Sequence, residues 1–147
     1  MIKRPLSLVL LMATLLPLAF NTACAASSAH ELKMAPMNVL PAEVQNAPTR
    51  VREAYQFALA NPAALKNVPC YCGCAAIGHT SDYTCFVTQT KADGTVVFDQ
   101  HALGCSLCVD IAQDVMQGTQ DGRAPPEIRA QVISTFSRFG PPNQPVN

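Results

Sequence analysis

Three cysteines fall within five residues in the stretch PCYCGC, which runs from Pro69 to Cys74. Neighbouring cysteines in such a run pair with each other only with strain, because disulfide geometry is narrow. Their sulfurs must therefore find distant partners or converge on one point. Six of the seven cysteines and two of the three histidines lie within residues 70–108: Cys70, Cys72, Cys74, His79, Cys85, His101, Cys105 and Cys108. This clustering predicts one chemical site, around which the rest of the chain must fold.

The first 25 residues have the features of a secretory signal peptide. Lys3 and Arg4 precede an apolar run, and small residues follow in NTACAAS. Cys24 lies in an A-x-A cleavage site and is also a candidate for lipidation, although Asn21 stands where a lipobox has Leu. One lipid at Cys24 would anchor the chain without spanning the membrane. We therefore expect an exported protein, either periplasmic or a lipoprotein on the outer side of a bacterial membrane.

Charge and composition limit the partners and the domain count. After residue 25 the chain keeps eight Lys and Arg against ten Asp and Glu, a formal charge of about −2. It has no basic patch for nucleic acid, so we expect a metal-ion partner, no nucleic acid, and membrane contact only through lipid. We divide the chain into a signal peptide (1–25), a flexible tether with Pro36 and Pro41 (26–46), one PCYCGC-type Cys/His domain (47–140) and a loose tail (141–147).

Apolar spacing predicts the helices. One begins near Pro48 and ends at Asn61-Pro62, which also starts a short second helix. A third covers residues 104–118, with Gly118 as its stop. A last helix follows Pro125. The predicted buried positions are Val51, Ala54, Tyr55, Ala58 and Leu59 in the first, Cys108, Ile111, Ala112 and Val115 in the third, and Ile128, Val132, Phe136 and Phe139 in the last.

Two β-rich runs, TCFVTQT and TVVFD, flank the turn sequence KADG and predict a β-hairpin. Cys85 would share a strand face with Val87 and point inward. The fold class is therefore α+β and mostly α: a small single domain of about three to four helices with one β-hairpin. The Cys/His site would lie between the hairpin and the helices. Such a small domain buries a modest core, so a metal or disulfides would help to hold it.

The cysteine spacing favours a metal site. Gly73 lets the C-x-C-x-C turn curl so that alternate thiolates face one centre, and Cys105-x-x-Cys108 is a familiar chelate spacing. A helix N-terminus beside the second thiol of this pair favours its thiolate. Six sulfurs and two imidazoles exceed the four ligands of one zinc, which suggests two ions or a thiolate-bridged cluster. The candidate ligands are Cys70, Cys72, Cys74, Cys85, Cys105 and Cys108, with His79 and His101 as ligands or hydrogen-bond donors to sulfur.

Soft thiolate and imidazole ligands select Cu(I) or zinc. Copper handling is largely a task of the cell envelope, so we rank copper(I) first, for sequestration or delivery, and keep zinc as the alternative. An envelope metal donor or acceptor protein is the expected partner.

Two other hypotheses for the function stay open. Six cysteines in an oxidising compartment could form three disulfides and staple an interaction module that binds no metal. Alternatively, Cys105-Ser-Leu-Cys108 at a helix start suits thiol–disulfide redox chemistry, although we find no βαβ units for a thioredoxin-like fold. His79 or His101 could act as a base for a cysteine nucleophile, but no third orienting residue stands out. We name no catalytic residue and favour binding over catalysis. Asp99, Asp110 and Asp114 fit a solvated surface.

The stretches VPCYCGCAAIGHTSDYTCFV and FDQHALGCSLCVDIA closely resemble the PCYCGC motif-containing family of bacterial envelope proteins and lipoproteins. The likeness runs from about Val51 to Phe139. The resemblance implies export and often lipidation. It implies no settled function, so the metal assignment rests on the residues themselves.

Overall fold

The computed structural model describes residues 30–146. The predicted signal peptide and Cys24 lie outside the described residues, so those interpretations stay predictions. The α-helices are α1 (Ala42–Gln45), α2 (Thr49–Ala60), α3 (Pro62–Lys66), α4 (His101–Gly104), α5 (Ser106–Gln120) and α6 (Pro125–Phe136). The strands are β1 (Val87–Thr90) and β2 (Val96–Phe98). Four short 3-10 helices complete the order: η1 (Met37–Val39), η2 (Cys74–Ile77), η3 (Asp82–Cys85) and η4 (Ser137–Phe139).

The predicted fold class is confirmed: one small, mostly helical domain with a two-stranded hairpin. The two short helices α1 and α4 add to the three to four that were predicted. None of the helices within residues 30–146 has the length and hydropathy that a membrane span requires.

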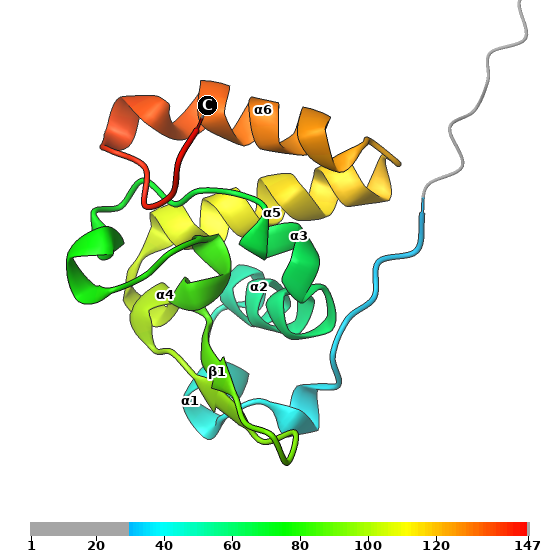
Figure 1. The fold of residues 1–147 in the computed structure, drawn as a ribbon. Helices are drawn as coiled ribbons and strands as arrows, with labels where there is room; N and C mark the ends of the chain where they lie inside the picture. The colour runs from blue at the N-terminus through cyan, green and yellow to red at the C-terminus, as the bar shows by residue number, and fades with distance from the viewer. Residues whose placement is uncertain (1–29, 147) are drawn as a thin grey trace, which may run out of the picture.

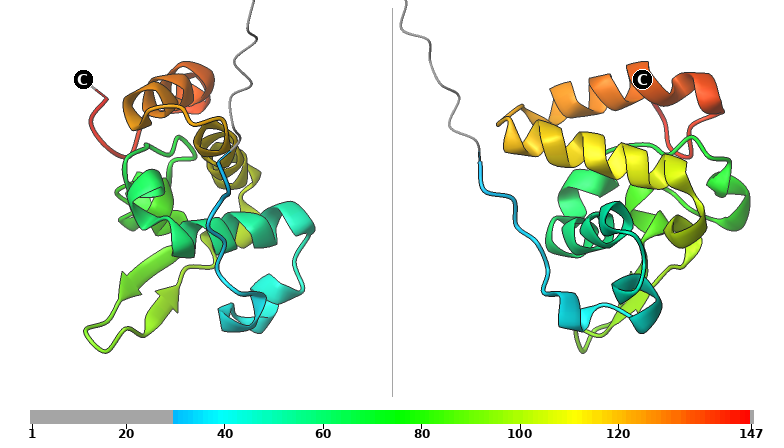
Figure 2. Two further views of the ribbon diagram at one scale, coloured as in Figure 1. Left: turned by 90° about the vertical axis from the view of Figure 1, so that its right-hand side faces the viewer. Right: turned by 180° about the vertical axis from the view of Figure 1, so that it is seen from behind.

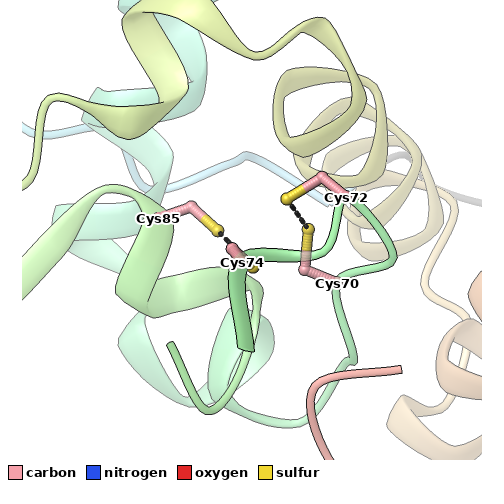
Figure 3. Close-up of side chains that lie close together, drawn as sticks. All are labelled: Cys70, Cys72, Cys74 and Cys85. Atoms are coloured by element: carbon pink, nitrogen blue, oxygen red, sulfur yellow. Dashed lines mark hydrogen bonds between the residues drawn. The ribbon is translucent and has the colours of Figure 1, made fainter. Parts of the chain in front are cut away.

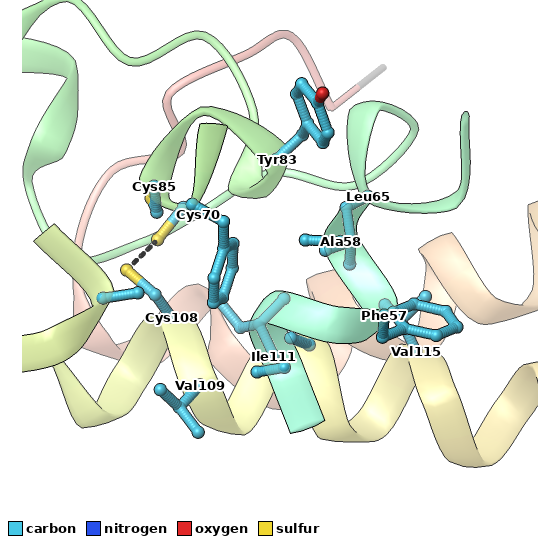
Figure 4. Packing of buried hydrophobic residues seen from close by; sticks show 14 of the residues in the cluster. Phe57, Ala58, Leu65, Cys70, Tyr83, Cys85, Cys108, Val109, Ile111 and Val115 are labelled. Carbon is cyan, nitrogen blue, oxygen red and sulfur yellow. Dashed lines mark hydrogen bonds between the residues drawn. The ribbon is translucent and has the colours of Figure 1, made fainter. Parts of the chain in front are cut away.

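Helix α5 is the central element of the fold, with α2 packed on one side and α6 on the other (Figures 1 and 2). Its predicted buried face is confirmed, since Cys108, Ile111, Ala112 and Val115 are all buried. Opposite them lie Tyr55 and Phe57 of α2, and Figure 4 shows Phe57 close to Val115. Burying one such large side chain stabilises the fold by about 1.5–3 kcal/mol. Cys70 and Cys108 belong to the same core, so the cysteine site is part of the hydrophobic interior.

Two predicted helix ends differ from the structure. Gly118 does not stop α5, which continues to Gln120, and a Cβ at Gly118 would lie 2.8 Å from Cγ1 of Ile128. This glycine therefore lets α6 approach α5, and Gly122, with a φ of 71°, follows the helix end instead. Phe139 was predicted to be buried, but it lies in η4 beyond the end of α6 and is 53 % exposed.

The hairpin is confirmed, with β1 antiparallel to β2 and an irregularity in register between Val87 and Gln89. It extends away from α6 at the other end of the molecule (Figure 1). Cys85 is fully buried as predicted, but it does not lie on a strand. It is the last residue of η3, because the chain makes a 3-10 turn before β1 begins at Val87.

The predicted tether over residues 26–46 differs from the structure in its described part. Leu40 and Val44 are buried in the core cluster. The Ala35 N–H donates to the Gln56 carbonyl at 3.1 Å, and the Gln56 side-chain amide donates to the Ala35 carbonyl at 2.6 Å. Pro36 and Pro41 do not keep the segment loose, because each immediately precedes a short helix, η1 and α1.

The predicted loose tail also packs on the domain. The Asn143 amide oxygen accepts a hydrogen bond from the Cys70 N–H at 2.8 Å, and the Asn143 N–H donates to the Cys70 carbonyl at 3.0 Å. Arg129 of α6 donates to the carbonyl of Pro145. The apolar content of the tail does not predict this packing, because the contacts that hold the tail are polar.

Candidate metal centre

The PCYCGC loop brings three thiols together through two glycines. Gly73 and Gly78 have φ angles of 82° and 92°, which lie in the left-handed region that favours glycine. They are the residues directly before and after η2, so a left-handed residue stands at each end of this short helix. The Cys70 and Cys72 sulfurs are 3.4 Å apart, and the Cys74 and Cys85 sulfurs are 3.7 Å apart (Figure 3). The curl predicted at Gly73 is therefore confirmed.

We expect Gly73→Ala to lower the free energy of unfolding by about 1–2 kcal/mol, because an L-residue with a side chain is strained in the left-handed region. No heavy atom lies within 4 Å of a Cβ at this position, so the cost is purely conformational. Urea unfolding of the metal-free chain measures it. Gly104→Ala is the matched control, since its Cβ also has open space and its φ is not in the left-handed region. Equal stabilities of the two variants would contradict the argument.

Cys108 of α5 closes the cluster from the other side. Its sulfur lies 3.5 Å from that of Cys70 and 3.6 Å from that of Cys72, and Figure 4 shows the first of these contacts. No disulfide joins any of the six cysteines in the described part of the chain. The separations are close to the roughly 3.8 Å edge of a tetrahedron of sulfurs that surrounds one metal at about 2.3 Å. The thiols are thus spaced as ligands of shared ions would be.

Four overlapping groups could each hold a metal ion, because their ligand atoms lie within 4.8 Å of one another. All six cysteines and both histidines that the sequence singled out belong to at least one group. The groups are Cys70, Cys72, Cys74 and Cys85; Cys72, His101, Cys105 and Cys108; Cys74, His79, Cys85 and His101; and Cys70, Asp82, Cys85 and Cys108. The sharing of members means that the residues form one continuous cluster.

The cluster has a closed and an open side. Cys70, Cys74, Cys85, Cys108 and His79 are buried. Cys72, His101 and Cys105 are only half-buried. An ion that exchanges with solvent or with another protein would therefore pass the half-buried ligands first.

Asp99 positions both histidines and does not lie on a solvated surface as predicted. Its carboxylate accepts from Nε2 of His79 at 3.3 Å and from the backbone N–H of His101 at 2.7 Å. Thr88 donates to the same carboxylate, and Tyr55 donates to the Asp99 carbonyl at 2.7 Å. With Nε2 held by Asp99, the buried Nδ1 of His79 has no hydrogen-bond partner. A carboxylate–histidine pair of this kind orients a ring nitrogen toward a metal.

His101 reaches the cluster through its own Nε2, which lies 3.3 Å from the sulfur of Cys72. The two imidazole rings meet edge to face, with centroids 5.2 Å apart. His101 therefore lies within hydrogen-bond distance of a sulfur, and the predicted roles of the two histidines as ligands or as donors to sulfur stay predictions.

We expect Asp99→Ala to weaken metal binding by about 10–100-fold, since the loss of a hydrogen bond to a ligating histidine typically has that effect. Competition titration against a chromophoric chelator measures the affinity. Asp110→Ala is the control, because Asp110 pairs with Arg50 on the exposed surface of α5. An affinity unchanged by Asp99→Ala would mean that neither histidine depends on this carboxylate for its function.

Asp82 is a further member of the cluster and was not among the predicted ligands. It is completely buried, and neither carboxylate oxygen has a hydrogen-bond partner. Burial, together with the nearby Cys70 sulfur, raises the pKa of this carboxyl well above its usual range. The available signal was its spacing, since Asp82 precedes Cys85 by one turn of a 3-10 helix.

The thiol that is easiest to ionise is not the one expected. A helix N-terminus was expected to favour the thiolate of Cys108, but hydrogen bonding with the Cys70 sulfur raises the pKa of Cys108. Donation from Cys108 and then from Cys85 holds the pKa of Cys70 far below its usual range. Burial and then the charge on Cys70 raise the pKa of Cys72. Among these thiols the lowest pKa therefore belongs to Cys70 and not to Cys108.

The C-terminal tail supports the loop from outside. Besides its two bonds to the Cys70 backbone, Asn143 donates from Nδ2 to the sulfur of Cys74 at 3.5 Å. A Cβ at Gly140 would lie 2.8 Å from the Tyr71 carbonyl oxygen, so the tail touches the loop closely there. The tail therefore helps to fix the geometry of two of the candidate ligands.

The family model described as a protein of unknown function with PCYCGC motif matches residues 21–145. This match covers the whole cluster, the segment before α2 and most of the C-terminal tail. No curated protein and no solved structure matches the chain.

Proposed function

Since the chain belongs to the family of proteins of unknown function with a PCYCGC motif, we propose from its own site that it binds soft metal ions, with Cu(I) foremost, for sequestration or delivery in the cell envelope. One observation carries this proposal. Six thiols and two imidazoles, from segments up to 38 residues apart, place their ligand atoms in overlapping groups within 4.8 Å. Packing of apolar side chains alone does not require thiols to gather in this way.

The chemistry of the ligands supports a soft metal. Thiolate and imidazole select Cu(I) and zinc over hard cations such as Mg²⁺ or Ca²⁺. Because every clustered cysteine except Cys105 belongs to more than one group, thiolates can bridge neighbouring ions. Bridged multinuclear sites suit Cu(I), while zinc would fill separate four-coordinate positions.

The place of action follows from the first 25 residues, whose charged start, apolar run and small-residue site are those of an export signal. We place the protein in the periplasm or on the outer side of a bacterial membrane, with Cys24 as the residue that would carry a lipid. The half-buried ligands Cys72, His101 and Cys105 support exchange with an envelope donor or acceptor protein.

Native mass spectrometry with elemental analysis and thiol counting tests the proposal. The chain is expressed with its own first 25 residues and purified anaerobically without chelator. We expect several copper ions per chain with all six clustered thiols reduced. We expect His101→Ala to weaken copper binding, whereas His30→Ala should not, because His30 lies near Gly122, outside the four groups.

Two outcomes would overturn the proposal. A metal-free chain with a mass six hydrogens below the reduced form would mean three disulfides and an interaction module. Turnover of a disulfide substrate that depends on Cys105, without metal uptake, would mean a thiol–disulfide redox protein.

A further inference from the structure

The buried carboxylate of Asp82 is the least expected group in the cluster. It is 0 % exposed, and both of its oxygens lack a hydrogen-bond partner. Native proteins leave few buried polar atoms unsatisfied, and buried charges are normally paired or bound to a metal. A bound cation would satisfy this carboxylate, and apolar packing does not provide one.

The local structure places this carboxylate in the cluster. Asp82 and Cys85 begin and end η3, and residues three apart in a 3-10 helix point in the same direction. The backbone N–H of Asp82 donates to the Val68 carbonyl at 3.1 Å, which ties the turn to the segment that leads into the PCYCGC loop. The capping role belongs to its neighbours, because Ser81 and Thr84 satisfy each other at the start of the turn. The carboxylate is thus free for another function.

A carboxylate oxygen of Asp82 and the sulfurs of Cys70, Cys85 and Cys108 all lie within 4.8 Å of one another, and all four residues are buried. Resting on the proposed function, we infer that these four residues form an inner position for a divalent cation of the zinc class. Three thiolates and one carboxylate complete the tetrahedral set that zinc takes in a closed site. A carboxylate is a hard ligand and does not suit Cu(I).

The second position differs in both chemistry and access. Cys72, His101 and Cys105 are half-buried, and with Cys108 they form a set without a carboxylate. This outer set suits Cu(I) and can exchange it. Cys108 belongs to both sets and would bridge the two positions. The cluster thus has a retained divalent ion inside and an exchangeable soft ion outside.

Metal titration of three variants tests this inference. Zinc and Cu(I) affinities are measured on the full chain, with Co²⁺ as the spectroscopic probe of the zinc position. Asp82→Asn keeps the shape of the side chain and removes the anionic ligand. We therefore expect the zinc affinity of the inner position to fall by at least about 100-fold, while the outer set still binds Cu(I). Asp82→Cys restores an anionic ligand, and we expect it to keep one divalent ion with a stronger thiolate-to-cobalt charge-transfer band. Asp114→Asn is the control, because it makes the same change at a half-buried carboxylate that lies outside the cluster.

The outcomes separate this inference from the proposed function. Equal zinc affinity and an equal cobalt spectrum for Asp82→Asn and the unaltered chain would overturn the inner position while Cu(I) binding stands. Loss of Cu(I) together with zinc in Asp82→Asn would overturn the distinction between the two positions. If the unaltered chain binds zinc but no Cu(I), the copper proposal fails and the inner position survives.

Discussion

Metal loading is expected to raise the free energy of unfolding of this chain by about 4 kcal/mol at a free metal concentration 1,000 times the dissociation constant. Only the folded chain brings Cys70 and Cys108 to 3.5 Å, so the unfolded state binds the ion more weakly. For a domain of this size the change corresponds to a rise in Tm of about 15 °C. The size of the effect is set by the ratio of free metal to the dissociation constant, and the site that binds the ion is part of the core cluster.

This shift is measured by thermal unfolding, monitored by circular dichroism. Three samples of the reduced chain are compared: metal-free, metal-loaded, and loaded and then stripped with a chelator that competes with the thiols for the metal. Mg²⁺ is the control ion, because it prefers oxygen ligands and should leave Tm unchanged. Identical melting curves for the loaded and stripped reduced chain would contradict the prediction. They would indicate that the apolar contacts of α2, α5 and α6 hold the fold without an ion.

The regular parts of the fold were predictable because their patterns are local. Tyr55 and Ala58 of α2, and Ile111 and Val115 of α5, repeat at helical spacing and are buried as expected. The clustered cysteines and histidines were also predictable, because their density in residues 70–108 is visible without knowledge of the fold. What the sequence left open was how they divide into groups, since this depends on where α5 returns to the PCYCGC loop.

Two carboxylates were missed for a physical reason. Asp82 stands in the polar stretch HTSD and Asp99 at the end of the β-rich run TVVFD, and at both places an aspartate is normally solvated. The 3-10 turn of η3 buries the first, and the end of the hairpin directs the second toward His79 and His101. Neither placement follows from helical or strand periodicity. Spacing to Cys85 and to His101 was the one available signal.

The packing of the terminal segments could not be predicted, because proline and polar residues are typical of loose segments. Leu40 and Val44 belong to no long apolar period, yet each is buried. Asn143 holds the Cys70 backbone through its own backbone and side-chain amides, which no apolar pattern reveals. Segments that pack through a few specific contacts carry little signal in composition.

Cys108→Ser is expected to reduce the affinity of both metal positions by at least about 100-fold, whereas Cys105→Ser should affect the outer one alone. Cys108 is completely buried and belongs both to the outer set and to the set that contains Asp82. Its sulfur contacts those of Cys70 and Cys72, so a serine hydroxyl there removes a soft ligand from the middle of the cluster. Cys105 belongs to the outer set and is half-buried. The change from sulfur to oxygen is the same in both variants, and only the position differs.

Native mass spectra of the two variants, titrated in parallel with zinc and Cu(I), give the number of ions that each retains. We expect one tightly held zinc in Cys105→Ser and none in Cys108→Ser. Circular dichroism of the reduced, metal-free proteins controls for folding, since serine is close to cysteine in shape. Equal stoichiometries would mean that the ligands act as one interchangeable pool. Because Cys108 lies on α5, between the core and the PCYCGC loop, an unequal result would show that the same helix that organises the fold also joins the two metal positions.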